Sequence, residues 1–243
     1  MKTVAIISTR LTSQRFPNKL IQIFNGKRII DHVIQNTKKL DFVDDIIIGS
    51  NDNQFAQQLC KSYKFIKSSH TSEATCGSQR AYNFYLTDPS YDFYMSVPAD
   101  EPAINPIEVN KVFNKKTQFN TDEIITFYTK FYCNRDLTSH LSCKIVSDDK
   151  NFMIYNSRAV VPVNKDGTYL NLEQYKKHVG LFVFPREVFT KHGNLWENTT
   201  DIESLEQNKF MQSFVHVRLV EMNHIGFGID TPDQIKQLES RLK

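Results

Sequence analysis

The sequence lacks long apolar runs, paired-cysteine motifs and long basic runs, and each absence excludes a class of protein. No apolar stretch reaches about 18 residues and no signal-type N-terminus occurs, so we expect a cytoplasmic protein with no membrane contact. Its four cysteines show no C-x-x-C spacing, which indicates reduced thiols rather than a zinc centre or disulfide framework. The net charge is +3 without a long Lys/Arg run, so nucleic acid is not an expected partner.

The common glycine-rich nucleotide motifs are missing as well. No GxxxxGK followed by Ser or Thr occurs, and no GxGxxG follows the first apolar run. What is present is typical of a globular protein: 243 residues, of which 40% are hydrophobic and 23% charged. That length accommodates one large domain, 1–243, with a small inserted lobe.

Apolar runs alternate with stretches of helical periodicity in the first half of the chain. This alternation predicts an α/β fold with a mostly parallel sheet and crossover helices. After about residue 121 strand-like runs follow one another with few helices, so we expect a small antiparallel lobe there. Predicted strands cover 4–7, 45–49, 65–66, 93–97, 123–127, 141–146, 153–156, 179–184 and 214–220, and predicted helices cover 29–40, 53–63, 77–86, 202–210 and 232–242.

The loop after the first strand concentrates positive charge. It reads STRLTSQRFPNK at 8–19 and holds Arg10, Arg15 and Lys19, with the hydroxyl residues Thr12 and Ser13 between them. Guanidinium groups grip phosphate oxygens bidentately, and an ammonium adds a mobile point charge, so the loop suits a nucleoside triphosphate. Ligands of open α/β sheets collect at the carboxyl ends of strands, which favours this reading over a merely solvated basic loop.

Two aspartates follow apolar segments far apart in the chain. Asp100 comes just after the strand predicted at 93–97, and Asp230 precedes the helix that begins at Pro232. Mg²⁺ prefers one or two carboxylates together with phosphate oxygens and water, so this pair predicts a magnesium site that bridges a triphosphate to the protein. The alternative for Asp230 is a helix N-cap, because Asp is favoured there and Pro suits the first turn.

Seven motifs in order give the chain a resemblance to the CMP-Kdo synthetases, the 3-deoxy-manno-octulosonate cytidylyltransferases, and it covers nearly the whole sequence. After the 8–19 loop come HTS and GSQR at 70–72 and 77–80, ADEPAI at 99–104, YNSR at 155–158, KHVG at 177–180, ESLEQ at 203–207 and GIDTP at 228–232. The resemblance implies a Rossmann-like nucleotidyltransferase fold, an inserted dimerisation lobe at about 128–185 and a homodimer. It also implies transfer of CMP from CTP to the anomeric hydroxyl of a Kdo-like 3-deoxy acidic sugar, with release of pyrophosphate, for lipopolysaccharide or surface-glycan synthesis.

The resemblance assigns roles residue by residue. Catalytic roles fall to Arg10, Lys19 and Asp100, and the metal Mg²⁺ to Asp100 and Asp230. The nucleotide is assigned to Arg10, Thr12, Ser13, Arg15, Lys19, Ser78 and Arg80, and the sugar to Arg158, His178, Glu206 and Gln207. Apart from the resemblance, a solvated Arg158, a satisfied core His178 and a solvent-facing pair of helix residues 206–207 are the alternatives.

Two departures leave the substrate open. Where the family has Gln-Gly-Asp-Glu-Pro this chain has Pro98-Ala99-Asp100-Glu101-Pro102, and where it has Thr-Asp-Arg this chain has Ser78-Gln79-Arg80. Lost polar contacts shift substrate preference, so 8-amino-Kdo or another acidic sugar is an alternative acceptor. Another nucleotide or a neutral sugar phosphate, and a non-catalytic nucleotide-binding relative, are the competing hypotheses.

Overall fold

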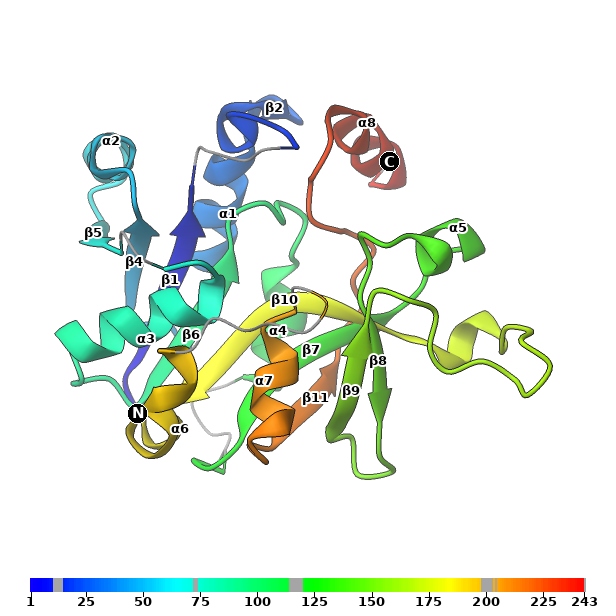
Figure 1. Ribbon diagram of the computed structural model, residues 1–243. Coiled ribbons are helices and arrows are strands. Elements are labelled where there is room, and N and C mark those ends of the chain that lie inside the picture. The colour runs from blue at the N-terminus through cyan, green and yellow to red at the C-terminus, as the bar shows by residue number, and fades with distance from the viewer. Residues whose placement is uncertain (11–14, 72–73, 114–119, 198–202, 204, 243) are drawn as a thin grey trace.

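A nine-stranded mixed sheet forms the centre of the part of the chain that the computed structural model describes, residues 1–10, 15–71, 74–113, 120–197, 203 and 205–242 (Figure 1). Its order is β11-β7-β10-β6-β1-β4-β5, and β8 joins β10 to β9. The strands are β1 Thr3–Thr9, β4 Asp45–Ser50, β5 Ile66–His70, β6 Phe93–Pro98, β7 Ile124–Lys130, β8 Lys144–Ser147, β9 Met153–Ser157, β10 Lys176–Pro185 and β11 Val217–Glu221.

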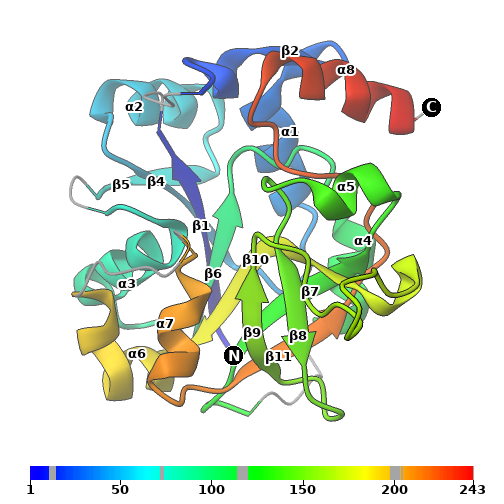
Figure 2. The same ribbon diagram turned by 45° about the vertical axis from the view of Figure 1, so that its right-hand side comes forward.

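Helices cover both faces of the sheet, as the two views in Figures 1 and 2 show. One apolar cluster joins alternate residues of the sheet to α1 (Ile29–Thr37), α2 (Asn53–Ser62), α4 (Pro106–Val112) and α8 (Pro232–Arg241). A second cluster, rich in aromatic rings, joins the opposite face to α3 (Gly77–Thr87), α6 (Arg186–His192) and α7 (Gln207–Gln212). Successive strand side chains point to opposite faces, which is why Ile7 enters the first cluster and Ile6 the second.

The predicted α/β class with a mostly parallel sheet is confirmed. Strands β1, β4, β5 and β6 pair in parallel, and β11 pairs in parallel with β7. Strand β10 lies antiparallel between β6 and β7. The run predicted at 179–184 is therefore part of the main sheet, and β8 and β9 form the antiparallel hairpin beside it.

Several short elements differ from the sequence expectation. Helices α4, α5 (Asn134–Thr138) and α6 were not predicted, because five to seven residues are too few to establish a helical period. The strand predicted at 141–146 begins at Lys144, so 141–143 belongs to a loop. A small hairpin of β2 (Ile23–Phe24) and β3 (Lys27–Arg28) turns at Asn25 and Gly26, whose φ angles are 45° and 78°.

The described helices are short, and none of them is apolar enough over sufficient length to cross a membrane. The four cysteines are free thiols.

Candidate active site

The edge of the sheet where β1 and β6 end carries the predicted phosphate loop and Asp100. The two strands are parallel neighbours, with Ser8 opposite Pro98. Arg10 follows directly after β1, and Asp100 follows β6 two residues beyond Pro98. The parallel register therefore brings together two segments that lie about ninety residues apart in sequence.

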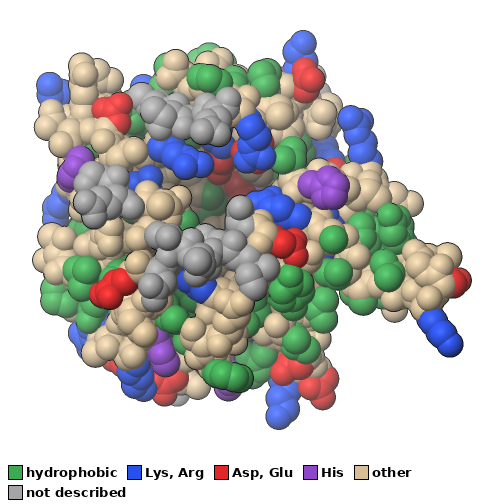
Figure 3. All heavy atoms as spheres, viewed as in Figure 1, with side chains coloured by type: hydrophobic (Ala, Val, Ile, Leu, Met, Phe, Trp, Pro, Cys, Tyr) green, Lys and Arg blue, Asp and Glu red, His purple; other side chains and the backbone are tan. Residues whose placement is uncertain are grey.

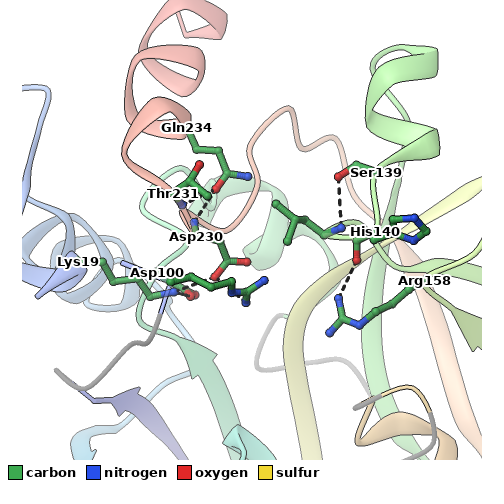
Figure 4. A network of polar contacts seen from close by, with 10 residues as sticks. Lys19, Asp100, Ser139, His140, Arg158, Asp230, Thr231 and Gln234 are labelled. Carbon is green, nitrogen blue, oxygen red and sulfur yellow. Dashed lines mark hydrogen bonds and ion pairs between the residues drawn. The ribbon is translucent and has the colours of Figure 1, made fainter. Parts of the chain in front are cut away.

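Lys19 joins the two aspartates. Its ammonium contacts a carboxylate oxygen of Asp100 and lies 3.2 Å from Asp230 Oδ1 (Figure 4). Arg15 Nη2 lies 3.2 Å from the same Asp230 oxygen. Burial of the ammonium opposes its charge, but the two carboxylates outweigh that effect and raise the pKa of Lys19 above its ordinary value. Lys19 and Arg15 thus lie with both carboxylates in one cluster, while Thr12 and Ser13 fall outside the described residues.

Backbone contacts fix the position of Asp230. The amide of Ile229 donates to the carbonyl of Asp100 at 2.9 Å, which ties the two segments together. Helix α8 has Thr231 as its N-cap, and the Gln234 side chain accepts from the amides of Asp230 and Thr231 at 2.6 and 2.9 Å (Figure 4). The alternative role of Asp230 as N-cap is therefore wrong, and its carboxylate is directed to Lys19 instead.

Arg80 is a buried cation beside Arg10. Its Nη1 donates to Thr71 Oγ1 at 2.8 Å and to the Thr71 carbonyl at 3.3 Å. Burial, and then the charge of Arg10, lower the pKa of Arg80. Two like charges held close together in one hollow favour an anionic ligand.

Glu206 is bound to the first turn of α3. Its Oε2 accepts from the Ser78 hydroxyl at 2.6 Å and from the Ser78 amide at 3.1 Å. An acidic side chain is favourable at a helix N-terminus, because free N–H groups and the helix dipole are positive there. The structure therefore directs Glu206, assigned to the sugar by the resemblance, toward the helix that carries Ser78 and Arg80.

Arg158 is held by backbone carbonyls. Its Nη1 donates to the His140 carbonyl at 2.9 Å, and its Nε donates to the Glu203 carbonyl at 3.1 Å. The Glu203 carboxylate accepts from the Arg158 amide at 2.7 Å. Figure 4 shows Arg158 and His140 across from Lys19, Asp100 and Asp230, and the same hollow is lined by residues of both groups. No role was predicted for Glu203 from the 203–207 motif, because its contact with Arg158 spans 45 residues of sequence.

His178 has partners at both ring nitrogens. Thr126 Oγ1 donates to the Leu181 carbonyl at 2.7 Å, so this hydroxyl accepts from His178 Nε2 at 2.8 Å. Gln207 Nε2 then donates to His178 Nδ1 at 3.3 Å. Burial lowers the pKa of His178 to about 4, so the ring is neutral at pH 7. The alternative of a hydrogen-bonded histidine is thus realised, although the ring lines the hollow.

Gln207 leaves an acceptor without a partner. Among the residues that the structure describes, Gln207 Oε1 is a buried oxygen with no hydrogen bond. An unpaired buried acceptor costs about 1–3 kcal/mol. Because Gln207 also lines the hollow beside Asp100, a ligand hydroxyl placed there would relieve that cost.

Two hollows meet at these residues. The larger, of about 710 Å³, is lined by Arg10, Arg15, Lys19, Arg80 and Glu206 among others, and the smaller, of about 480 Å³, by residues 139, 141–143, 158, 177 and 226–228 among others. They share Asp100, His178, Gln207 and Asp230 with three further residues. Figure 3 shows basic side chains around a depression in this face, with acidic side chains inside it. Each volume suits a small ligand.

The donor set at the junction fits a hard divalent cation. The cluster offers two carboxylates, which already share the ammonium of Lys19 as a positive centre. Within the described part of the chain no group of three or more His, Cys, Asp and Glu side chains is placed to hold a metal. Mg²⁺ accepts such a sparse protein set when phosphate oxygens and water complete its shell.

Comparison with known proteins gives the family. The sequence profile described as cytidylyltransferase matches residues 4–221. The chain is 27% identical over 252 residues to a 3-deoxy-manno-octulosonate cytidylyltransferase of Pelobacter propionicus, covering 100% of this chain and 98% of the relative. It is 26% identical to the protein of the same name from Parabacteroides distasonis, covering 98% and 96%.

Solved structures agree on the fold. A CMP:2-keto-3-deoxy-manno-octonic acid synthetase complexed with CTP superposes with a TM-score of 0.83 at 23% identity, covering 100% of this chain and 98% of the other. The inositol-1-phosphate CTP transferase from T. maritima gives a TM-score of 0.67 at 14% identity, covering 100% and 96%. The relationship inferred from the seven motifs is thereby confirmed, and the chain belongs to the cytidylyltransferase family, as a CTP-dependent nucleotidyltransferase related to CMP-Kdo synthetase.

Proposed function

We propose that this protein transfers CMP from CTP to the anomeric hydroxyl of a Kdo-like 3-deoxy acidic sugar, with Mg²⁺, in the cytoplasm and for lipopolysaccharide or surface-glycan synthesis. The observation that carries the proposal is the junction of the two hollows at Asp100 and Asp230, with cations on both sides. A reaction that joins two anionic substrates at one phosphorus requires such an arrangement.

The larger hollow suits the triphosphate. Arg10, Arg15 and Lys19 line it from the 8–19 loop and Arg80 lines it from α3, so several phosphate oxygens can be bound at once. Asp100 and Asp230 would hold Mg²⁺, which supplies charge neutralisation of the phosphates when bound. We assign charge stabilisation on the departing pyrophosphate to Arg10 and Lys19.

The smaller hollow suits an acidic polyhydroxy acceptor. The Arg158 guanidinium donates to backbone carbonyls through Nε and Nη1, and it can pair with a sugar carboxylate at this end of the smaller hollow. Gln207 Oε1, which has no hydrogen bond among the described residues, suits a sugar hydroxyl as donor. Together the two side chains favour an acceptor with a carboxylate and hydroxyl groups over a neutral sugar phosphate.

The chemistry then consists of alignment and charge stabilisation. The acceptor oxygen attacks the α-phosphorus, its proton passes to water, and the bond from the α-phosphorus to the oxygen that bridges the α- and β-phosphates breaks to release pyrophosphate. His178 is neutral and its Nδ1 lone pair is occupied by Gln207, so it orients groups and does not remove the proton. No covalent enzyme intermediate is required.

We also propose a homodimer formed through the lobe at about 128–185. Exposed apolar side chains gather in this lobe, including Tyr132, Ile154, Val163 and Tyr169, each at least 46% exposed. Such side chains favour an interface. Light scattering should give twice the 28.3 kDa chain mass, and a monomer at all concentrations would refute this part of the proposal.

The test follows pyrophosphate release with CTP, Mg²⁺ and Kdo, and with 8-amino-Kdo in parallel. Asp100→Ala should abolish release, and the matched variant Asp149→Ala, which removes an exposed aspartate of the β8–β9 turn, should leave it intact. Pyrophosphate release with 8-amino-Kdo but not with Kdo would identify the amino sugar as the acceptor. Binding of CTP without release for any acidic sugar would refute catalysis and favour a nucleotide-binding relative.

A further inference from the structure

Lys144 is a fully buried lysine outside the residues discussed above. It opens strand β8, its relative exposure is 0%, and its Nζ donates to three backbone carbonyls: Ser139 at 2.7 Å, Ser142 at 2.9 Å and Arg158 at 2.8 Å. An ammonium has three protons, so every one of them is used. Burial of a lysine is costly and needs such complete hydrogen bonding.

The three carbonyls belong to two segments that line the smaller hollow. Ser139 and Ser142 delimit a turn in which the Ser142 amide donates to the Ser139 carbonyl at 3.2 Å. The same turn supplies the His140 carbonyl that binds the Arg158 guanidinium (Figure 4). Lys144 therefore binds the backbone of Arg158 directly and also shapes the turn that orients its side chain.

Cys143, between the turn and Lys144, connects the turn to the strand that carries His178. The carbonyl of Cys143 accepts from the His178 amide at 3.0 Å. Residues 139–143 thus contact both Arg158 and the strand that carries His178, and Lys144 is the cation at their centre.

We propose that Lys144 is the positioning residue of the acceptor site: its ammonium locks the 139–143 turn to the end of β9 and thereby fixes the Arg158 guanidinium for the acidic sugar. This inference rests on the proposed function for the identity of the ligand. Arg158 lines the larger hollow as well, but the four cations assigned to the triphosphate, Arg10, Arg15, Lys19 and Arg80, come from the first loop and α3, so we expect CTP binding to depend little on Lys144.

The protonated form of Lys144 is the one that holds the turn. A neutral amine donates two hydrogen bonds and directs a lone pair at the third carbonyl. Burial lowers the pKa of Lys144 to about 8, so the turn loses one of its three hydrogen bonds to Lys144 as the pH rises through that value. The charged and titratable groups facing it are Cys143, Arg158, Glu203 and Lys177. Burial raises the pKa of the Cys143 thiol to about 11, so this thiol stays neutral across the relevant range.

The experiment compares Lys144→Met with Lys176→Met as matched control. Lys176 makes its bonds to Ser147 and Asn151, at the other end of the β8–β9 hairpin. We expect Lys144→Met to raise the acceptor KM at least about tenfold while the Kd for CTP changes less than about twofold. In the wild type the acceptor KM should rise above about pH 8, and this step should vanish in Lys144→Met but persist in the control.

Three outcomes overturn the proposal: an unchanged acceptor KM, an equal loss of CTP affinity, or a pH step retained in Lys144→Met. If Lys144→Met does not fold, Lys144→Gln, whose amide keeps two donors, is measured by the same criteria. Amide hydrogen exchange in the substrate-free protein separates this inference from the proposed function. Faster exchange in 139–143 for the Lys144 variant alone supports the lock even if no acidic sugar is turned over, and unchanged exchange refutes it.

Discussion

Replacement of Glu206 tests whether this residue binds substrate or stabilises the nucleotide side of the site. In Glu206→Ala the hydroxyl and amide of Ser78 lose their shared acceptor at the start of α3. Ser78 is completely buried, so water does not replace the lost partner easily. Glu206→Gln keeps an acceptor oxygen but removes the negative charge at the helix N-terminus.

The expected loss follows from the two hydrogen bonds. Bonds to a charged acceptor contribute about 1.5–3 kcal/mol each in general, and Glu206 is half-buried, so we take about 2–3 kcal/mol for both. At about 2–4 °C per kcal/mol for a chain of this size, Glu206→Ala should lower the Tm by about 4–12 °C. Glu206→Gln should lose about 1 kcal/mol and about 2–4 °C, because charge assistance and the dipole term are lost.

Thermal unfolding and steady-state kinetics provide the readout. Because α3 also carries Arg80, loosening its first turn should raise the KM for CTP more than the KM for the acceptor. Glu173→Ala, which removes an exposed glutamate, should change neither quantity. An unaltered Tm in Glu206→Ala together with a raised acceptor KM would refute the reasoning and restore Glu206 to the sugar site.

Two further predictions concern an unpaired acceptor and an ion pair. Steady-state kinetics should show that Gln207→Leu raises the acceptor KM about tenfold and changes the KM for CTP little. The control Gln212→Leu, on the exposed side of the same helix, should change neither KM. Burial opposes ionisation of Asp31, but hydrogen bonds from Arg28 and Tyr63 outweigh it and hold its pKa below the ordinary 3.8. A depressed carboxyl pKa contributes stability that is present above pH 3.8 and is lost as the pH falls below that value. The free energy of unfolding, measured with urea, should therefore decrease less between pH 6 and pH 3 in Asp31→Asn than in the wild type.

The sequence alone was sufficient to predict at which edge of the sheet the site lies. Apolar runs such as the one that forms β1 are local signals, and the carboxyl ends of parallel strands must share an edge. The approach of the first loop to Asp100 could therefore be expected before any contact was known. The turn at Asn25 and Gly26 is also encoded locally, since Asn-Gly is a strong hairpin signal.

Only the tertiary structure decided what each polar side chain does at the site. Glu206 meets Ser78 across 128 residues, and Glu203 meets Arg158 across 45, so no local pattern contains either contact. The burial of Lys144 was equally hidden, because a lysine in a strand is by default a solvated residue. Periodicity and turn chemistry act over a few residues and determine the helices, strands and turns, whereas hydrogen bonds at the site depend on how those elements pack. The local sequence therefore determined where the site lies, and the tertiary structure determined which side chains are hydrogen-bonded to one another there.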